Sequence, residues 1–215
     1  MKEHPIIFNT PMVQAILDGR KTQTRRVVKP QPKPHQSGGW VWEKVGGVIA
    51  TASGKIYKSK MLIRNPYGKP SDRLWVRETF TIIDDREFGG DLYPEYKADN
   101  PNAKYPGEWP EDEAKGNPEA PKWKPSIHMP KKYARIWLEI TGVRVERLKG
   151  LTPEDGIAEG VEHWSIFPSL WDSINGKKHP WKSNPWVWVV EFTKSLPPST
   201  KNGFAVDENE GKSGS

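Results

Sequence analysis

The 215-residue sequence contains no cysteine. This absence excludes a disulfide framework, a thiolate nucleophile and any zinc site with cysteine ligands. The sequence also lacks an apolar run near the roughly 20 residues that a membrane span requires. Its first ten residues, MKEHPIIFNT, lack the apolar core of a signal peptide. We therefore expect a soluble protein of the cytoplasm.

Hydrophobic residues make up only 34% of the chain. Since 11 of these residues are tryptophans, aliphatic residues make up a smaller share still, and the chain also holds 21 prolines. Such a composition favours a small β-rich core covered by loops that pack on aromatic rings. Lysine and arginine outnumber the acidic residues by 33 to 27, a net charge of +6. This surplus favours an anionic partner such as nucleic acid, although a modest surplus also serves solubility.

Periodicity and turn residues predict an α+β fold. The expected helices cover residues 11–18, 153–159 and 168–176, and the expected strands cover 20–28, 73–80, 133–148 and 184–192. The last strand, NPWVWVVEF, is apolar on both faces, which predicts an inner position in the sheet. Gly142 predicts a bulge or a bend within the longest strand.

Two long segments separate these elements. Residues 31–69 begin with a Pro/Gly-rich loop and continue with expected hairpins at Gly46-Gly47 and Ser53-Gly54. Residues 81–122 are so rich in proline and glycine that we expect no regular structure, only a lid or a binding insertion. We therefore predict a single domain at 1–196 with two insertions, and a disordered tail at 197–215.

The stretch GRKTQTRR, residues 19–26, is the most unusual segment. Neighbouring cations lower the pKa of a lysine, and a neutral Lys21 could deprotonate a hydroxyl such as that of Thr24. In a regular strand these two side chains would face opposite sides, so the pair requires the turn after Gly19 to continue past Lys21. A solvated basic strand and a phosphate contact through the arginines are the alternatives.

Two carboxylates are candidates for acid–base chemistry. Glu159 ends the predicted helix at 153–159, where the helix dipole raises the pKa of a carboxyl and favours a general acid. Glu78 is the alternative, in a strand where it could pair with Arg77 or Arg64. Each of the two residues also suits a surface or structural role.

No pair of histidines has metal-ligand spacing, so we expect no metal site. The sequence contains neither a Walker A motif nor G-x-G-x-x-G, and we expect no cofactor. His128 precedes the longest strand and either lines a groove or packs within its loop. Trp75 and Trp137 lie on strands near arginines and are the tryptophans best placed to stack on RNA bases. The alternative is that the tryptophans hold proline-rich loops against the core.

Four motifs occur in order: G-R-K-T-x-T-x-R, D-x-L-W-V, L-T-x-E-x-x-x-A-E-G and V-x-V-x-E-F. Together they resemble the ASCH domain, a family whose β-barrel is related to the PUA domain. The chain is most similar to longer members from phages and prophages, which share segments like PSIHMP, LWDSI and NPWVWVVEF. The resemblance touches most of residues 5–30, 70–80 and 123–194. It implies a small curled mixed β-barrel with short flanking helices and long loop insertions, located in the bacterial host cytoplasm if phage-encoded.

The resemblance also implies an activity. ASCH proteins are thought to bind RNA or nucleotides, and one bacterial branch hydrolyses N4-acetylcytidine to cytidine and acetate with a lysine, a threonine and a glutamate. Matching the motifs places these roles on Lys21 as the base, Thr24 as the nucleophile and Glu159 as the acid. Arg20, Arg25 or backbone N–H groups would stabilise the oxyanion.

The expected ligand is therefore an acylated nucleoside or RNA, without a metal. The residues expected to bind it are Arg20, Arg25, Trp75, Arg77, Glu78, His128 and Trp137. The alternatives are a non-catalytic module that binds RNA or nucleotides and, less favoured, a ribonuclease, since some ASCH relatives are reported to cleave RNA.

Overall fold

The structure, a computed structural model, describes residues 1–34, 40–42, 47–50, 65–84, 86, 90–107 and 109–198, with the backbone alone at 40–42 and 47–50. The expected turn at Ser53-Gly54 lies outside these residues, and the turn at Gly46-Gly47 lies partly outside them. Most of the expected tail at 197–215 also lies outside them. No helix among the described residues is long and apolar enough to cross a membrane.

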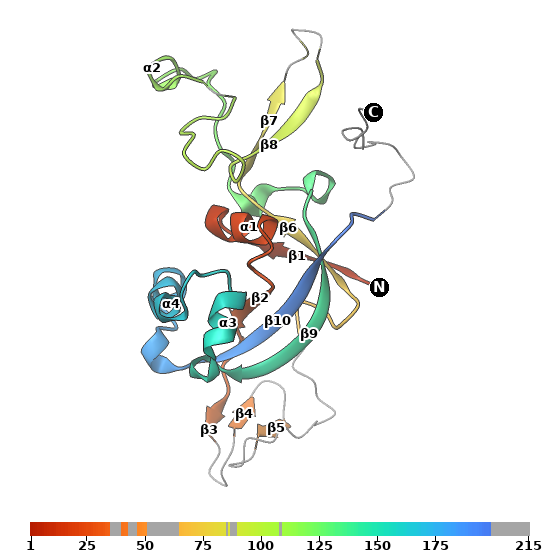
Figure 1. Ribbon diagram of the computed structural model, residues 1–215, viewed down its shortest axis with the longest axis vertical. Helices are drawn as coiled ribbons and strands as arrows, with labels where there is room; N and C mark the ends of the chain where they lie inside the picture. Colours follow the sequence, from red (N-terminus) through yellow and green to blue (C-terminus); the bar gives the residue numbers. More distant parts are fainter. Residues whose placement is uncertain are drawn as a thin grey trace, which may run out of the picture.

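The body of the molecule is a five-stranded mixed sheet in the order β1-β6-β9-β10-β2. Its strands are β1 (Glu3–Ile7), β2 (Gln23–Val27), β6 (Arg73–Arg77), β9 (Trp137–Arg147) and β10 (Trp186–Ser195). β1 runs parallel to β6, and the other neighbours are antiparallel. β9 and β10 are long and curve together, with α3 and α4 on the concave side (Figure 1). The predicted α+β class is confirmed, whereas the closed barrel stays a prediction, because β1 and β2 end the described sheet as its two edges.

The four helices are α1 (Thr10–Leu17), α2 (Glu111–Ala114), α3 (Pro153–Ala158) and α4 (Phe167–Asn175). Three of them, α1, α3 and α4, lie within one residue of the ranges that the sequence signals predict, whereas α2 was not predicted. α3 begins with a full capping box. The Asp155 backbone N–H donates to the Thr152 side chain, and the Thr152 backbone N–H donates to the Asp155 side chain. Glu159 is the C-cap of this helix.

β10 carries the core on both of its faces, which confirms its predicted inner position. Val190 and Phe192 belong to the cluster that includes Val13 and Ile16 of α1. Val187 and Val189 belong to a second cluster with Phe167 and Trp171 of α4. Since successive side chains of a strand point to opposite faces, α1 and α4 cover opposite sides of the sheet. The pairing of β9 with β10 shifts between Glu191 and Phe192, opposite Gly142, so the predicted bulge is confirmed.

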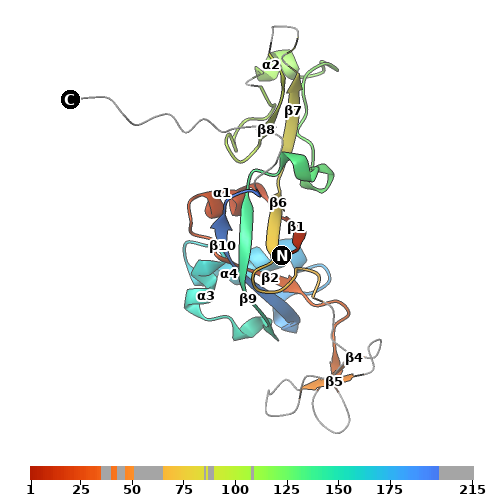
Figure 2. The ribbon, with the colours of Figure 1, turned by 90° about the vertical axis from the view of Figure 1, so that its right-hand side faces the viewer.

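The two insertions form small sheets of their own. Part of the first makes β3 (Lys33–Pro34), β4 (Trp40–Trp42) and β5 (Gly47–Ala50). The second holds β8 (Leu92–Tyr96), which pairs with β7 (Phe80–Asp84) in a hairpin that extends away from the main sheet (Figures 1 and 2). The prediction that residues 81–122 lack regular structure was therefore wrong. β8 tolerates Pro94 because a two-stranded ribbon leaves one side of each strand unpaired.

Short 3₁₀ helices connect the remaining elements. They are η2 (Ser126–His128), η3 (Lys131–Tyr133), η4 (Leu148–Gly150), η5 (Trp164–Ile166) and η6 (Trp181–Ser183).

Candidate functional site

The chain returns from α1 to β2 along the end of α3. Gly19 adopts a φ of +74°, a conformation that suits glycine, and turns the chain out of α1. Lys21 then forms an isolated antiparallel bridge with Glu159 before β2 begins. The Lys21 backbone N–H donates to Ala15 O at 2.9 Å, which ties the bridge to α1. Two motifs that lie 138 positions apart in the sequence thus meet at one point.

Gly160 permits this approach. Its φ is +90°, and a Cβ atom here would lie 2.9 Å from the Cβ of Ala15 and 3.0 Å from the Cβ of Lys21. Both the backbone conformation and the lack of space therefore require glycine at the end of the L-T-x-E-x-x-x-A-E-G motif.

The ammonium group of Lys21 is completely buried and uses all of its donors. Its Nζ donates to Gln23 O at 2.8 Å, to Glu159 O at 2.7 Å and to Glu159 Oε2 at 3.0 Å. Burial lowers the pKa of Lys21, and the charge of Glu159 acts in the opposite direction. The lysine is thus held in one position, with the carboxylate of Glu159 as its side-chain acceptor.

Arg25 holds the other oxygen of the same carboxylate. Its Nη1 lies 3.3 Å from Glu159 Oε1, and its Nη2 lies 2.6 Å from Glu146 Oε1 and 2.8 Å from Asp155 Oδ2. Arg144 adds contacts from its Nε to Glu146 at 3.0 Å and from its Nη2 to Asp155 at 3.2 Å. Each carboxylate therefore touches two cations, the arrangement that offsets the cost of burying charge. Because these pairs occupy both Nη atoms of Arg25, they count against the predicted role of Arg25 at an oxyanion.

A cavity of about 640 Å³ opens beside this cluster, a volume typical of small-molecule sites. Thr24, Arg25, Arg26 and Glu159 line it, whereas Lys21 is not among the lining residues. Thr24 is only 2% exposed. Aromatic side chains form another part of the wall: Tyr67, Phe167, Trp171 and Trp188. The cavity thus joins an acid, a hydroxyl and a cationic donor to an apolar surface.

Arg26 is a functional candidate that the sequence analysis missed. Its Nη2 donates to Ile7 O at 2.6 Å, and its guanidinium carbon lies 5.1 Å from the centre of the Phe8 ring. Its Nε is buried and has no hydrogen-bond partner among the described residues. Burial lowers the pKa of Arg26. Two-residue periodicity places Thr24 and Arg26 on the same face of β2, and this signal was present in the sequence.

The other residues expected to bind substrate do not line the cavity. Arg20 is exposed and bonds to Gly160 O at 3.0 Å and to Asp18 at 2.9 Å. Trp75 and Trp137 are register partners on β6 and β9, and the guanidinium of Arg77 lies 5.5 Å from the Trp75 ring. The structure thus places this aromatic and basic group apart from the candidate site.

Glu78 is a buried structural charge in this structure. Both of its oxygens pair with Arg135, Oε1 with Nε at 3.0 Å and Oε2 with Nη2 at 3.1 Å, instead of the expected Arg77. The other expected partner, Arg64, lies outside the described residues. Burial raises the pKa of Glu78, and Arg135 opposes the shift.

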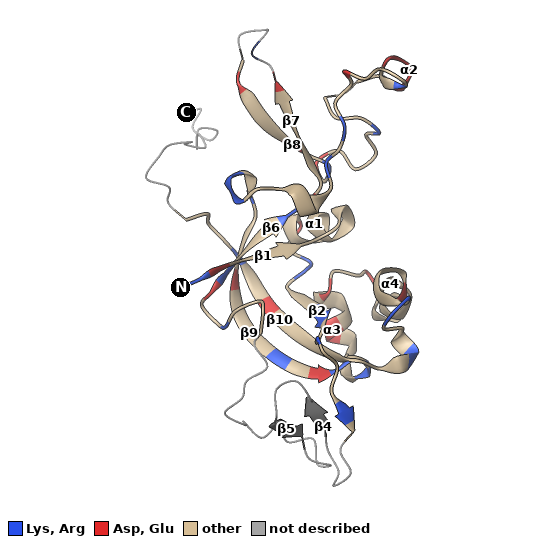
Figure 3. Ribbon diagram, turned by 180° about the vertical axis from the view of Figure 1, so that it is seen from behind, with Lys and Arg blue, Asp and Glu red and all other residues tan. Residues whose placement is uncertain are grey.

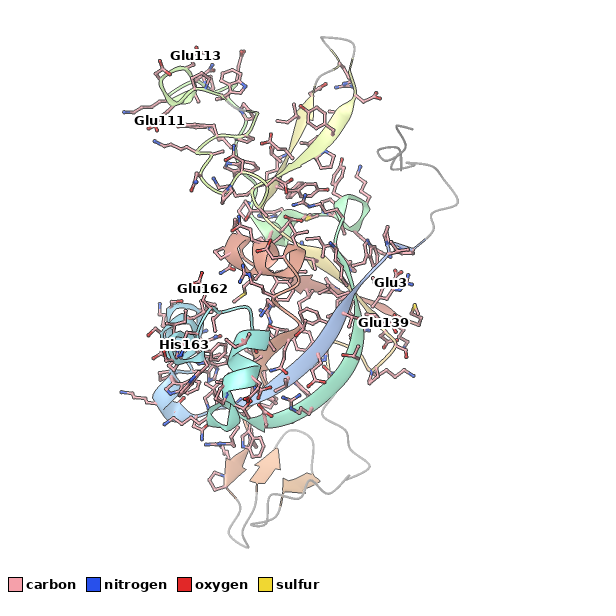
Figure 4. The ribbon with its side chains drawn as sticks, in the orientation of Figure 1. Glu3, Glu111, Glu113, Glu139, Glu162 and His163 are labelled. Carbon is pink, nitrogen blue, oxygen red and sulfur yellow. The ribbon has the colours of Figure 1, made fainter. Side chains whose placement is uncertain are left out.

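The described histidines lie in separate parts of the structure. His128 is exposed in η2, and His163, labelled in Figure 4 between α3 and α4, contacts Ser165 Oγ through its Nδ1 at 2.7 Å. In the described part of the chain, no group of three or more His, Asp or Glu side chains is placed to hold a metal ion.

The sequence matches no protein-family model and no curated protein. Among solved structures, the chain is similar to a crystal structure of protein EF3133 from Enterococcus faecalis V583, which is assigned to family model DUF984. That similarity covers 95% of this chain and 87% of the other, with 8% identity and a TM-score of 0.40. At this level, the similarity carries no argument about the site or its function.

Proposed function

We propose that the protein is an amidohydrolase that converts N4-acetylcytidine to cytidine and acetate, as the ASCH-like motifs imply. One observation carries the proposal. The buried pair of Lys21 and Glu159, joined at 3.0 Å, adjoins a cavity that Thr24 and Glu159 both line. The base would come from the bridge before β2, the nucleophile from β2 itself and the acid from the end of α3.

The burial of the pair suits the chemistry. Burial disfavours the charged ammonium group of Lys21, because that group loses its hydration. Transfer of one proton from Lys21 Nζ to Glu159 Oε2 therefore creates a base and an acid in a single step. The lowered pKa of Lys21 favours this transfer.

The neutral pair then acts on the amide. Lys21 takes the hydroxyl proton of Thr24 as the Thr24 oxygen forms a bond to the acetyl carbon. The bond from that carbon to N4 breaks, and Glu159 gives its proton to the departing cytosine nitrogen. Water next attacks the threonine ester, giving its proton to Glu159, while Lys21 returns a proton to the Thr24 oxygen. Acetic acid leaves, and the neutral amine and acid are restored.

The developing oxyanion needs a donor, and Arg26 is the best supported one. Arg20 does not line the cavity, and both Nη atoms of Arg25 are engaged by carboxylates. Arg25 and Arg26 both line the cavity and both keep a buried Nε without a partner among the described residues, but the Arg26 guanidinium forms no ion pair with a described carboxylate. A pre-oriented donor of this kind contributes strongly where water is excluded.

The test is deacetylation of N4-acetylcytidine by the purified protein, followed by chromatography. Lys21→Ala, Thr24→Val and Glu159→Gln are each expected to lower kcat by about 10²- to 10⁴-fold, the usual range for acid–base groups. Thr22→Val is the matched control, since this neighbouring threonine is exposed and does not line the cavity. Full activity in both the Lys21 and the Thr24 variants would exclude this triad.

A non-catalytic module that binds RNA or nucleotides is the second candidate. It is favoured by the excess of cationic over acidic side chains among the residues that line the cavity. Binding of cytidine nucleotides that weakens steeply with salt, without turnover of N4-acetylcytidine, would support it instead.

A further inference from the structure

Three lysines from two distant segments line the outer part of the same cavity. Lys29 follows β2, whereas Lys177 and Lys178 follow α4, and all three are exposed. We call these three residues the cationic rim. Figure 3 shows in blue the basic residues of the segment after α4. Among the described residues that line the cavity, Glu159 is the one with a carboxylate, and this carboxylate already pairs with Lys21 and Arg25.

The charges of the two segments act on one place. His179, which also lines the cavity, has its pKa lowered by burial and then by the charges of Lys29 and Lys178. None of the three rim lysines forms an ion pair with a carboxylate in the described part of the chain. Within the described residues, no carboxylate therefore offsets the charge of the rim by an ion pair.

A structural explanation covers only part of this arrangement. Cations that follow a helix C-terminus stabilise its dipole, which accounts for lysines directly after α4. It does not account for Lys29, which reaches the same cavity from the end of β2. Keeping three like charges around one opening costs free energy that a bound anion would recover.

We propose that the cationic rim binds a phosphate group of the substrate, so that the ligand of this cavity is an acylated cytidine nucleotide instead of the free nucleoside. The acyl group would lie at Thr24 and Glu159, the base against the aromatic wall and the phosphate at the rim. The assignment of the acyl group rests on the proposed function, whereas the phosphate site does not. The phosphate belongs either to a mononucleotide or to an RNA chain.

The first test measures binding without turnover. Cytidine, cytidine 5′-monophosphate and the trinucleotide CpCpC are titrated calorimetrically into the wild-type protein at 50 mM and 300 mM salt. The monophosphate is expected to bind at least about tenfold more tightly than cytidine at low salt, the equivalent of roughly 1.4 kcal/mol. The advantage should shrink at high salt. Further tightening by the trinucleotide identifies RNA as the phosphate source, and equal affinity identifies the mononucleotide.

The second test removes the rim charges. Lys177→Ala/Lys178→Ala is expected to abolish most of the preference for the monophosphate while leaving the affinity for cytidine unchanged. Lys115→Ala/Lys122→Ala is the matched control, because it removes the same charge from two exposed lysines that do not line the cavity. Neither pair lies in the buried core, so both variants are expected to fold.

The outcomes separate the two proposals. Equal affinities for cytidine and its monophosphate in the wild-type protein would overturn the phosphate site, whatever the catalytic result. A preference for the monophosphate that both double variants lose equally would also overturn it, since net charge alone would then explain the binding. A preference lost only in the rim variant, without turnover of N4-acetylcytidine or its 5′-monophosphate, would uphold the phosphate site and reject the amidohydrolase.

Discussion

The buried pair of Lys21 and Glu159 makes a quantitative prediction about stability. In Glu159→Leu, Lys21 loses one of its three acceptors and Arg25 loses one of its three carboxylate contacts. Both cations stay buried with less compensation, so the free energy of unfolding should fall by about 3–5 kcal/mol. Lys21→Met leaves two backbone carbonyls without a donor while Arg25 still compensates Glu159, and should cost about 2–4 kcal/mol.

The double variant Lys21→Met/Glu159→Leu tests the reasoning. Because it removes both charges together, its cost should be smaller than the sum of the single costs by about 1–3 kcal/mol. Urea unfolding monitored by tryptophan fluorescence measures all three values, and the 11 tryptophans give a strong signal. Asp18→Asn is the control, since its pair with Arg20 is exposed and should contribute well under about 1 kcal/mol. Strictly additive costs, or single costs below those of the control, would refute the account.

Three further predictions concern the same cluster. Gly160→Ala should lower the free energy of unfolding by about 1–3 kcal/mol, because of backbone strain and the close contact with Lys21, and should also lower activity. Gly150→Ala, where a Cβ has open space, should change neither stability nor activity. Although burial alone would raise it, hydrogen bonds from the Thr152 backbone, Gln23 and Arg25 lower the pKa of Asp155. Its contribution to stability is therefore present above the unfolded-state pKa and lost as the pH falls through the folded-state value, so Asp155→Asn should flatten the acid limb of a pH–stability curve. Arg25→Lys should lower kcat more than it raises KM and shift the pH profile of kcat, because Arg25 positions Glu159; an unchanged pH profile would count against this role.

Local sequence signals predicted the secondary structure around the site well. The capping box at Thr152 set the start of α3, and the all-apolar pattern of β10 required a strand covered on both faces. The failure at residues 81–122 has a physical cause. Proline and glycine weaken a strand prediction, but β8 is held by its cross-strand pairing with β7, which composition does not reveal.

The candidate site was predictable in part. The motifs led to Lys21, Thr24 and Glu159, and the structure joins Lys21 to Glu159 and lines the cavity with Thr24 and Glu159. The expected binding role of Trp75 and Trp137 had no such support, because residue type and a neighbouring arginine do not say which cavity a side chain reaches. The two tryptophans face each other across β6 and β9 instead.

The sequence by itself determined where the chain turns, which strand lies inside the sheet and which short motifs hold unusual charge, because these properties follow from residues that are neighbours in the chain. Only the tertiary structure decided how that charge is used. It engaged Arg25 with three carboxylates, left the Nε of Arg26 buried beside the cavity and brought Lys29 to the same opening as Lys177 and Lys178. Burial and partner choice depend on contacts between segments more than 100 positions apart in the sequence, and these contacts form only when the helices pack on the sheet.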